Sequence, residues 1–545
     1  MDSLFRSKIR RDGPGCAVGI YRKGGIVFAR GFGLANTENQ QPITTRTAFD
    51  LGSASKPFAA LAALTLEQQG KLSLDDDVRR WLPELPDYGS PIRIRDLLQH
   101  TSGLRDYGAL GTISGRSVSD MAEFQGLMAA QRKLNFTPGT KHEYSHSDYL
   151  LLALILERVV GMPFGPHLER TVLRPLGMQD AFVNDERPHS GKNRAFGHTV
   201  TIGGARMAFP HSRTVGGVNL YASVRDLARW DRNFEQSAVG GRAVIERMTS
   251  RPQLANGDTI PYAYGLRLGT YRGLRTISRG GNTGVTRTEF IRFPDHAFAV
   301  ATLCNADTLD PRKLGQTVAD LYLGTFMLPA RAQLRPPAAV SVSPVELARY
   351  VGVYKSTDNE WNPLHIELRN GKLGELLFHD VLDDSLFTMT PAGEGRFFEV
   401  GLTGNIGILT FRSASPDAPL SVELSWNGGA AETLYRVADS TRWLPGAHVL
   451  KEYTGTWFSD EIDAGWRLDV RGERLILMRN GKRDLSLRPV ERDKFIRGFG
   501  PWIDEFTAQL QFHRDGAGNI THLTVSTPPG EESVRDLRFV RVLQQ

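Results

Sequence analysis

The stretch Gly52-Ser53-Ala54-Ser55-Lys56 follows an apolar, strand-like run and opens a long helical one. Residues 56–70 are rich in Ala and Leu, which are good helix formers, and Gly70 is a typical helix stop. Positions i and i+3 share a face of a helix, so Ser53 is predicted to lie one turn from the amine of Lys56. A serine in this place can act as a nucleophile when a buried, neutral lysine takes its proton.

The same five residues have an ordinary structural interpretation. In that interpretation Ser53 is a helix N-cap and Lys56 is a solvated side chain. A chain of this length is expected to contain S-x-x-K about once or twice by chance. The other motifs of the chain therefore decide between the two interpretations.

Composition indicates a globular protein of several domains. The chain has 545 residues, of which 40% are hydrophobic and 23% are charged, which fits roughly three or four ordinary domains. No apolar run reaches the roughly 20 residues that a membrane-spanning helix needs. Residues 1–8 lack the apolar core of a signal peptide. We therefore expect no membrane partner and a cytoplasmic protein, or a periplasmic one if a leader was removed.

Charge and cysteine content exclude two further classes of function. The net charge of +6 is spread along the chain without a basic tract, which does not fit a nucleic-acid-binding surface. The two cysteines, Cys16 and Cys304, both lie in strand-like apolar runs. They are predicted to be buried free thiols and not a disulfide or a metal site.

The first 310 residues have strands at both ends and helices between them. Residues 16–33 read as a hairpin with a glycine turn, and residues 290–293 pair plausibly with 298–303. A strongly apolar helix is predicted over 148–160, where Gly161 ends it. This order of elements predicts one α/β domain whose first and last strands share a sheet.

Beyond a linker rich in proline and alanine, at 335–344, the chain contains an internal repeat of short strands. Leu347-Ala348-Arg349-Tyr350-Val351-Gly352-Val353-Tyr354 matches Leu450-Lys451-Glu452-Tyr453-Thr454-Gly455-Thr456-Trp457. Two strand-rich repeats of about a hundred residues predict two small antiparallel β-barrels.

Several motifs of the first 310 residues resemble the serine β-lactamase and penicillin-binding-protein superfamily, in its class C β-lactamase and D,D-peptidase branch. The resemblance covers about residues 13–310. The stretches that carry it occur in the family's order: Phe49-Asp50-Leu51-Gly52-Ser53-Ala54-Ser55-Lys56, Leu97-Leu98-Gln99-His100-Thr101-Ser102-Gly103-Leu104, Pro138-Gly139-Thr140, Tyr144-Ser145-His146-Ser147-Asp148-Tyr149, Arg174-Pro175-Leu176-Gly177-Met178 and Ala222-Ser223-Val224-Arg225-Asp226-Leu227-Ala228-Arg229.

The resemblance implies a fold and a domain layout. It implies an α/β (α+β) β-lactamase-like catalytic domain over residues 1–335. Two small antiparallel β-barrel domains follow, a lipocalin-like one at 345–440 and its repeat at 446–545. This three-domain layout is similar to that of D-aminopeptidase relatives.

The resemblance also implies roles for the residues of the first two motifs. Ser53 is expected to be the nucleophile and Lys56 its proton acceptor. Tyr144 matches the tyrosine of the family's Tyr-x-Asn motif and is expected to relay the proton to the leaving group; a buried aromatic with a satisfied hydroxyl is the alternative. The Asn of that motif is His146 here, which we expect to bind substrate as a hydrogen-bond donor.

The third motif departs from the family pattern. Ser278-Arg279-Gly280 matches Lys-Thr-Gly or His-x-Gly, and the usual cation at its first position is absent. On a strand Arg279 is predicted to face the other side and not to replace that cation. These three residues are expected to line the substrate site, and the backbone N–H groups of Ser53 and Gly281 are expected to form the oxyanion hole.

Two further motifs need an interpretation. His100-Thr101-Ser102-Gly103 is specific for the family but is expected only to shape a turn. Residues 142–146 read His-Glu-Tyr-Ser-His, which matches the zinc signature H-E-x-x-H. That signature requires a helix interior, whereas here the helix is predicted to begin after His146, so coincidence is preferred.

Together these observations predict a serine hydrolase that cleaves an amide or peptide bond through an acyl-enzyme. An aminopeptidase or amidase acting on small or linear peptides with D-residues is favoured. The alternatives are a carboxylesterase of the same fold, a non-catalytic penicillin-binding-like protein and a zinc hydrolase. We expect no cofactor and no metal, a small-molecule or short-peptide substrate, and we leave a homodimer open. Residues 497–502 are a candidate loop for narrowing the cleft.

Overall fold

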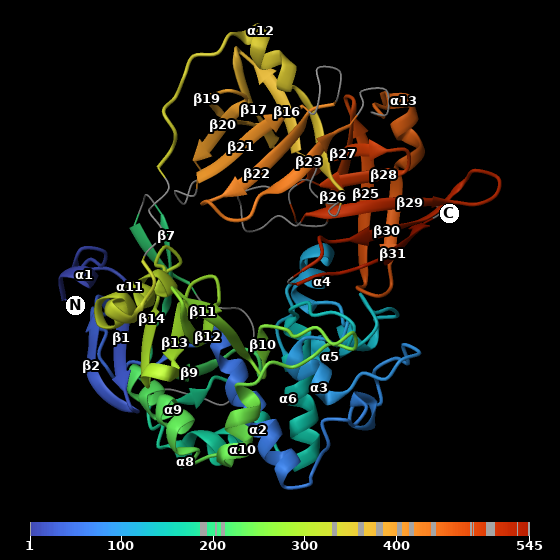
Figure 1. Cartoon of the computed structure of the whole chain (residues 1–545). Helices are drawn as coiled ribbons and strands as arrows, with labels where there is room; N and C mark the ends of the chain where they lie inside the picture. The colour runs from blue at the N-terminus through green and yellow to red at the C-terminus, as the bar shows by residue number, and fades with distance from the viewer. Residues whose placement is uncertain are drawn as a thin grey trace. The chain divides into compact units, whose positions relative to one another are not determined.

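The computed structural model describes most of the chain (Figure 1). The described residues are 2–185, 193–201, 204–208, 213–329, 335–357, 364–377, 385–400, 406–413, 419–437, 443–479, 482, 484–497, 507–530 and 532–542. They form two compact units. The first contains residues 1–108, 117–330 and 530–533, and the second contains 109–116, 331–529 and 534–545. The division into three domains predicted from the sequence stays a prediction.

The first unit is built on a seven-stranded antiparallel sheet of order β10-β11-β12-β13-β14-β1-β2. The first and last long strands of the unit pair with each other, as predicted, because β1 lies beside β14 with Ala17 opposite Leu303. Both predicted hairpins, β1–β2 and β13–β14, are confirmed. The strands are β1 (Cys16–Arg22), β2 (Gly25–Phe32), β10 (Tyr262–Ala263), β11 (Leu266–Tyr271), β12 (Leu274–Asn282), β13 (Arg287–Phe293) and β14 (Phe298–Cys304).

Helices cover both faces of this sheet because its strands carry apolar side chains on both faces. Ala17 and Tyr21 of β1 belong to a large core that also contains α2 (Lys56–Gln68), α6 (His146–Val160) and α9 (Val224–Gln236). Val18 and Ile20 belong to a second core with α11 (Pro311–Leu323). Side chains that alternate along one strand therefore pack against the helices on opposite faces of the sheet. Helices α2 and α6 confirm the two helices predicted from apolar periodicity.

The remaining elements of the first unit are short, and they connect the sheet with the two helical layers. They are α1 (Asp2–Arg6), β3 (Leu34–Asn36), β4 (Gln41–Pro42), β5 (Phe49–Asp50), η1 (Gly52–Ser55), η2 (Val78–Arg80), α3 (Ile94–Gln99), α5 (Met121–Ala129), α7 (Phe164–Leu168), η3 (Glu169–Leu173), α8 (Arg174–Leu176), β6 (Phe182–Val183), β7 (Gly197–Thr201), β8 (Gly204–Ala208), β9 (Leu220–Ala222), α10 (Gly241–Met248), η4 (Pro294–His296) and η5 (Gly324–Phe326).

The prediction that both cysteines are free thiols is wrong. Cys16 and Cys304 stand opposite each other on the neighbouring strands β1 and β14 and form a disulfide bond. Their Cα atoms are 4.1 Å apart although the two residues are 288 positions apart in the chain. The pairing follows from the register of two strands at opposite ends of the first unit, which the local sequence around each cysteine does not reveal.

The second unit contains the two strand-rich repeats. In the first repeat a nine-stranded sheet begins with β18 and ends with β19. These two strands are separated in the chain only by Met389, so the sheet closes on itself almost completely. Its strands are β15 (Gly352–Ser356), β16 (Leu364–Arg369), β17 (Lys372–Leu377), β18 (Ser385–Thr388), β19 (Thr390–Gly393), β20 (Arg396–Val400), β21 (Ile406–Arg412), β22 (Ser421–Trp426) and β23 (Glu432–Arg436).

In the second repeat eight strands form a closed barrel, as predicted. They are β24 (Gly455–Ser459), β25 (Ala464–Arg471), β26 (Arg474–Arg479), β27 (Leu485–Glu491), β28 (Lys494–Arg497), β29 (Ala508–Arg514), β30 (Ile520–Ser526) and β31 (Leu537–Val542). Each repeat opens with a short helix, α12 (Pro344–Leu347) or α13 (Ala447–Leu450), followed by a 3-10 turn, η6 (Ala348–Tyr350) or η8 (Lys451–Tyr453).

The two repeats share a specific buried contact at their first strand. The hydroxyl of Tyr354 donates to the carbonyl of Tyr350 at 2.9 Å. At the matching place, Nε1 of Trp457 donates to the carbonyl of Tyr453 at 3.3 Å. The repeat predicted from the sequence is therefore a repeat of structure as well.

The second unit also includes residues 109–116, which lie far from it in the sequence. Most of helix α4 (Tyr107–Ser114) is in this segment. Nε1 of Trp466 donates to the carbonyl of Ile113 at 3.1 Å, and Arg479 donates to the carbonyl of Thr112 at 2.8 Å. These bonds bring side-chain donors to carbonyl groups of the last turn of α4.

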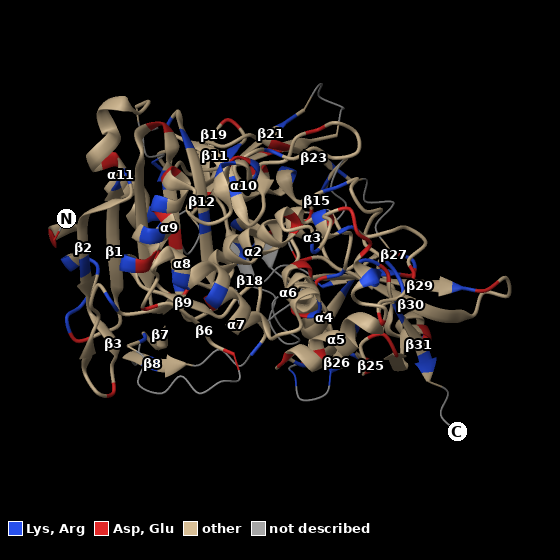
Figure 2. Cartoon of the chain, turned by 90° about the horizontal axis from the view of Figure 1, so that it is seen from below, with Lys and Arg blue, Asp and Glu red and all other residues tan. Residues whose placement is uncertain are grey.

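The distribution of charged residues and the lengths of the helices bear on the predictions about nucleic-acid and membrane partners. Lys and Arg are intermixed with Asp and Glu over the described chain (Figure 2). Among the described helices, none taken singly is long and apolar enough to cross a membrane. By length and composition, His146–Val160 passes that test together with Phe164–Leu176, as a pair bent by 76°.

We predict that the disulfide stabilises the first unit. Replacing both Cys16 and Cys304 by serine should lower its free energy of unfolding by about 2–5 kcal/mol, because the bond closes a very long loop in the unfolded chain. Urea denaturation followed by circular dichroism measures the change. Thiol titration of the denatured wild-type chain without reductant is the control, and two reactive thiols there would contradict the pairing.

Candidate functional site

Ser53 lies at the start of the helix predicted from the sequence. It belongs to the 3-10 turn η1, which runs directly into α2. Gly52, before it, has a φ of +52°, a conformation that glycine adopts without strain. A Cβ atom on Gly52 would lie 3.0 Å from the backbone nitrogen of Asn282, so this glycine lets η1 approach β12 closely.

The side chains of Ser53, Lys56 and Tyr144 meet, as the sequence predicts. Oγ of Ser53 lies 2.8 Å from the hydroxyl oxygen of Tyr144, and Nζ of Lys56 donates to Oγ of Ser53 at 3.2 Å. The lysine also donates to the carbonyl of Gly217 at 3.2 Å. Lys56 is fully buried, and Ser53 is buried with 9% of its surface exposed. The serine therefore has two groups within reach that can accept or return its proton.

The prediction that Arg279 faces away from the site is wrong. Its guanidinium donates to the hydroxyl oxygen of Tyr144 at 2.6 Å and to the carbonyl of Ser53 at 3.1 Å. Arg279 is buried, with 3% of its surface exposed. The reason is the register of β12, in which Ser278 lies opposite Arg267 of β11. Successive side chains of a strand point to opposite faces of the sheet, so the side chain of Arg279 points to the face that carries η1. Arg279 therefore supplies a cation to the site.

Two buried cations change the acidity of the tyrosine. Burial by itself raises the pKa of Tyr144, but Arg279 and Lys56 outweigh it and bring that pKa down to about 7. Burial also lowers the pKa of Lys56 from its ordinary value and outweighs the attraction of the tyrosine oxygen. Near neutral pH a substantial share of Tyr144 is thus ionised, and this phenolate can act as a base beside Ser53.

The predicted oxyanion donor Gly281 needs a correction. Hydrogen-bonded and non-hydrogen-bonded pairs alternate along antiparallel strands. The N–H of Thr283 donates to the carbonyl of Thr286 at the hairpin end, so Gly281, two residues earlier, forms a hydrogen-bonded pair with Thr288 of β13. Its N–H is therefore directed to β13 and not to the site.

The next residue, Asn282, has the opposite orientation. Its N–H points away from β13, toward the side of β12 on which β11 lies. The described pairing of β11 with β12 ends at Ser278, so β11 does not occupy the N–H of Asn282. The close approach of Gly52 to this nitrogen places it beside the nucleophile. The backbone of Asn282 is thus the donor on β12 that can accompany the N–H of Ser53.

His146 lies at the first turn of α6, beside the tyrosine. Its ring is 5.2 Å from that of Tyr144 in an edge-to-face arrangement. Nδ1 of His146 lies 3.4 Å from a carboxylate oxygen of Asp106. Burial lowers the pKa of His146, but the oxygens of Tyr144 and Asp106 raise it more, to about 9. A protonated His146 presents donors only, which agrees with the donor role predicted for it.

Sequence reasoning missed the carboxylate of Glu532. This residue follows β30 of the second repeat in the sequence, but residues 530–533 belong to the first unit. Its N–H donates to the carbonyl of Tyr144 at 2.8 Å, and the carbonyl of Ser533 accepts from the N–H of Asp106 at 3.1 Å. The available signal was Pro528-Pro529-Gly530, a loop sequence between two strands. The loop that the sequence favoured for narrowing the cleft, 497–502, lies outside the described residues except for Arg497.

These groups line a cavity of 510 Å³ in the first unit. Ser53, Tyr144, His146, Ser278, Arg279 and Gly280 all border it, so the structure brings these predicted residues together. The cavity has charges of both signs. They come from Arg267, Arg287, Arg312, Glu289, Asp310 and Glu532. Burial raises the pKa of Glu289 to about 7, so this carboxyl group is partly protonated at neutral pH.

The zinc signature does not have the geometry that its chemistry needs. Helix α6 begins at His146, so His142 lies outside it and the two histidines do not share a helix face. The ring of His142 packs instead against Tyr262, with centroids 5.4 Å apart.

His100, the first residue of its motif, supports the site through a chain of buried contacts. Nδ1 of His100 lies 2.7 Å from Asp148 and Nε2 lies 2.9 Å from the hydroxyl of Tyr262, and all three residues are buried. The ring of Tyr262 in turn faces the guanidinium of Arg279 at 5.5 Å. His100 has a φ of +56° and ends α3, which agrees with the turn predicted from the sequence.

Comparison with known proteins identifies a family of serine hydrolases, which agrees with the geometry around Ser53. A family model described as Beta-lactamase matches residues 1–324. Penicillin-binding protein 4* of Bacillus subtilis (strain 168) is 28% identical over 401 residues, which cover 69% of this chain and 85% of that protein. A D-aminopeptidase of Brucella anthropi is 26% identical over 537 residues, which cover 94% and 93%.

A solved structure supports the fold. The octameric penicillin-binding protein homologue from Pyrococcus abyssi has a TM-score of 0.55 and 22% identity, and the match covers 78% of this chain and 96% of that one. Since the family model matches more than half of the chain, and since Ser53 has the surroundings of a nucleophile, the chain belongs to the β-lactamase family and is a serine hydrolase of that fold.

Proposed function

We propose that this protein is an aminopeptidase or amidase that cleaves short peptides or amides carrying a free amino group, with a preference for D-residues. The observation that carries the proposal is the oxygen of Tyr144, 2.8 Å from Oγ of Ser53 and bonded to Arg279. The preference for D-residues is supported by the similarity to D-aminopeptidases over almost the whole chain.

Acylation begins with attack of Oγ of Ser53 on the substrate carbonyl carbon. The serine proton passes to the oxygen of Tyr144, and the carbonyl oxygen becomes an anion held by the N–H groups of Ser53 and Asn282. Tyr144 then protonates the leaving nitrogen as the C–N bond breaks. An ester of Ser53 and a free amine result.

Deacylation uses the same groups in reverse. Tyr144, again a phenolate, takes a proton from water while the water oxygen attacks the ester carbonyl. Lys56 and Arg279 keep the tyrosine ionised between these steps, because each stabilises the negative oxygen. No step requires a cofactor.

The free amino group of the substrate is assigned to Glu532. Its carboxylate lines the cavity that contains Ser53, and 51% of its side-chain surface is exposed. The substrate ammonium can therefore reach it from the solvent side. A carboxylate at this place favours substrates whose amino end is unblocked.

The first test concerns the nucleophile. Ser53→Ala should abolish hydrolysis of D-alanine p-nitroanilide, and Lys56→Ala should lower kcat by about 10²-fold or more. The double variant should be no slower than Ser53→Ala, because the two residues act as a unit. Intact-mass spectrometry after a fluorophosphonate should show one adduct on Ser53. Absence of the adduct in a folded chain would favour the non-catalytic alternative.

The second test concerns the acidity of Tyr144. Because a phenolate is the base, kcat/KM should rise with pH through about 7 and level off above it. Arg279→Leu removes a cation that lowers the pKa of Tyr144, so this acid limb should move to higher pH by about one to three units. Arg279→Lys should move it less.

A matched control lies on the same strand. Arg275 of β12 is exposed and pairs with Asp295 at 2.6 Å, away from the cavity. Arg275→Leu should leave the acid limb where it is. An equal shift in Arg275→Leu and Arg279→Leu would show that general charge, and not the contact with Tyr144, sets the pH profile.

The third test concerns Glu532. Glu532→Gln should lower kcat/KM for D-alanine p-nitroanilide by about tenfold or more, because a charge-assisted bond to the ammonium is lost. Hydrolysis of p-nitrophenyl acetate, which has no amino group, should change little. If both substrates lose the same factor, Glu532 supports the loop and does not recognise the amino end, and the esterase alternative gains support.

A further inference from the structure

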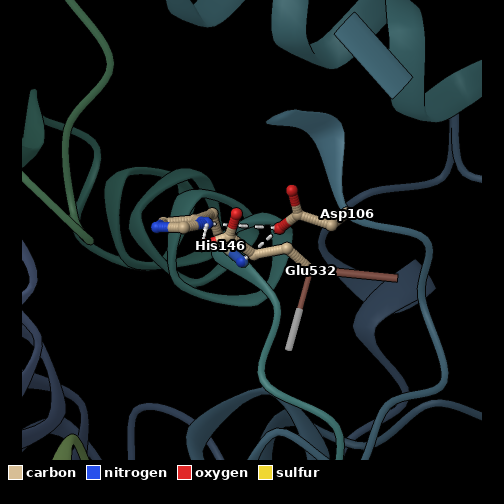
Figure 3. A group of neighbouring side chains, drawn as sticks. All are labelled: Asp106, His146 and Glu532. Carbon is tan, nitrogen blue, oxygen red and sulfur yellow. Dashed lines mark hydrogen bonds and ion pairs between the residues drawn. The ribbon is translucent and has the colours of Figure 1, made fainter. Parts of the chain in front are cut away.

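Three side chains with metal-ligating chemistry converge at the rim of the cavity. Asp106, His146 and Glu532 come from three separate segments of the first unit, and their ligand atoms all lie within 4.8 Å of one another (Figure 3). An imidazole with two carboxylates is a donor set that divalent transition metals accept.

The distances between the imidazole nitrogen and the two carboxylate oxygens are closer to those between ligands of one metal ion than to those of a hydrogen bond. Nδ1 of His146 lies 3.4 Å from Oδ2 of Asp106 and 3.5 Å from Oε1 of Glu532. Hydrogen bonds between nitrogen and oxygen are about 2.7–3.2 Å long. Ligands at ~2.0–2.1 Å from a tetrahedral Zn²⁺ are, by geometry, separated by ~3.3–3.4 Å. The distances from the imidazole to the two carboxylates are therefore close to the edge length of a zinc tetrahedron.

One of the three ligands, Asp106, is held in place by the backbone around it. Oδ2 of Asp106 accepts the N–H of His146 at 2.6 Å, and Oδ1 accepts the N–H of Gly108 at 2.8 Å. Asp106 is fully buried. Fixed ligand orientation of this kind is what raises the affinity of metal sites.

Glu532 is anchored by its main chain and keeps a partly exposed carboxylate. The N–H of Glu532 donates to the carbonyl of Tyr144, while half of its side-chain surface is exposed. His146 and Glu532 both line the cavity, so the fourth position of an ion faces a space that water can fill.

We propose that Asp106, His146 and Glu532 bind one divalent cation, with Zn²⁺ as the best fit. His146 ligates through Nδ1, and the proton on that nitrogen leaves to solvent. The ion has no role in the chemistry at Ser53. It occupies the carboxylate of Glu532 and so competes with a substrate ammonium; this inhibitory part rests on the proposed function, whereas the site itself does not.

The test measures binding without activity, in the full chain carrying Ser53→Ala. Calorimetry with Zn²⁺ should show one ion per chain, and Co²⁺ should give the absorption bands of a tetrahedral site. Adding His146→Asn or Glu532→Gln should weaken binding at least about tenfold, with the fold checked by circular dichroism. Binding that both variants leave unchanged would overturn the site and leave an ion pair only.

His142→Gln is the matched control, since His142 belongs to the same pentapeptide but does not reach the cluster. It should leave the Co²⁺ spectrum and the Zn²⁺ affinity unchanged. Loss of binding in His142→Gln, with His146→Asn unaffected, would transfer the ion to a different site and overturn the proposal.

The inhibitory part has its own readout. Hydrolysis of D-alanine p-nitroanilide by the wild-type enzyme should fall as Zn²⁺ is added and recover with a chelator. An enzyme that binds Zn²⁺ with unchanged hydrolysis would overturn inhibition but not the site. An enzyme that cleaves no amide would contradict the proposed function, and the Co²⁺ result would stand by itself.

Discussion

The contact between the Tyr144 oxygen and the Arg279 guanidinium is the interaction on which the site depends. Arg279 and Lys56 are two cations in a buried space, and buried cations are costly unless a negative charge accompanies them. An ionised tyrosine supplies that charge. Burial by itself works against this ionisation, so it is the two cations that turn an ordinary phenol into a base near neutral pH.

This arrangement requires backbone segments to approach unusually closely. A Cβ atom on Gly281 would lie 1.8 Å from the carbonyl oxygen of Leu51, so glycine is required where β12 passes η1. Thr288 of the neighbouring strand donates its hydroxyl to the same carbonyl at 2.9 Å. The segment that carries the nucleophile is thus held against the sheet by close backbone packing and by hydrogen bonds from the side chains of Thr288 and Arg279.

The sequence was most informative where the signal is local. The spacing of Ser53 and Lys56, the hairpin at 16–33 and the apolar helix before Gly161 each follow from a few neighbouring residues, and all three are confirmed. It was least informative where two distant segments meet. The pairing of Cys16 with Cys304 and the position of Glu532 depend on contacts across 288 and nearly 400 residues.

Arg279 and Gly281 show a subtler limit. Their chemistry was recognised, but the direction of each group depends on the phase of β12, which its pairing with β11 and β13 sets. An offset of one residue exchanges the faces of a strand. A short motif therefore identifies the residues that line the site, but it does not predict which of their side chains and N–H groups point toward the nucleophile.

The place of Glu532 in the chain has a consequence for synthesis. Ribosomes make proteins from the N-terminus, and domains generally fold in that order as they emerge. Ser53, Lys56 and Tyr144 are all made before residues 530–533, which follow Tyr144 by nearly 400 positions. A nascent chain therefore carries its nucleophile long before the ribosome makes the loop that completes the cavity.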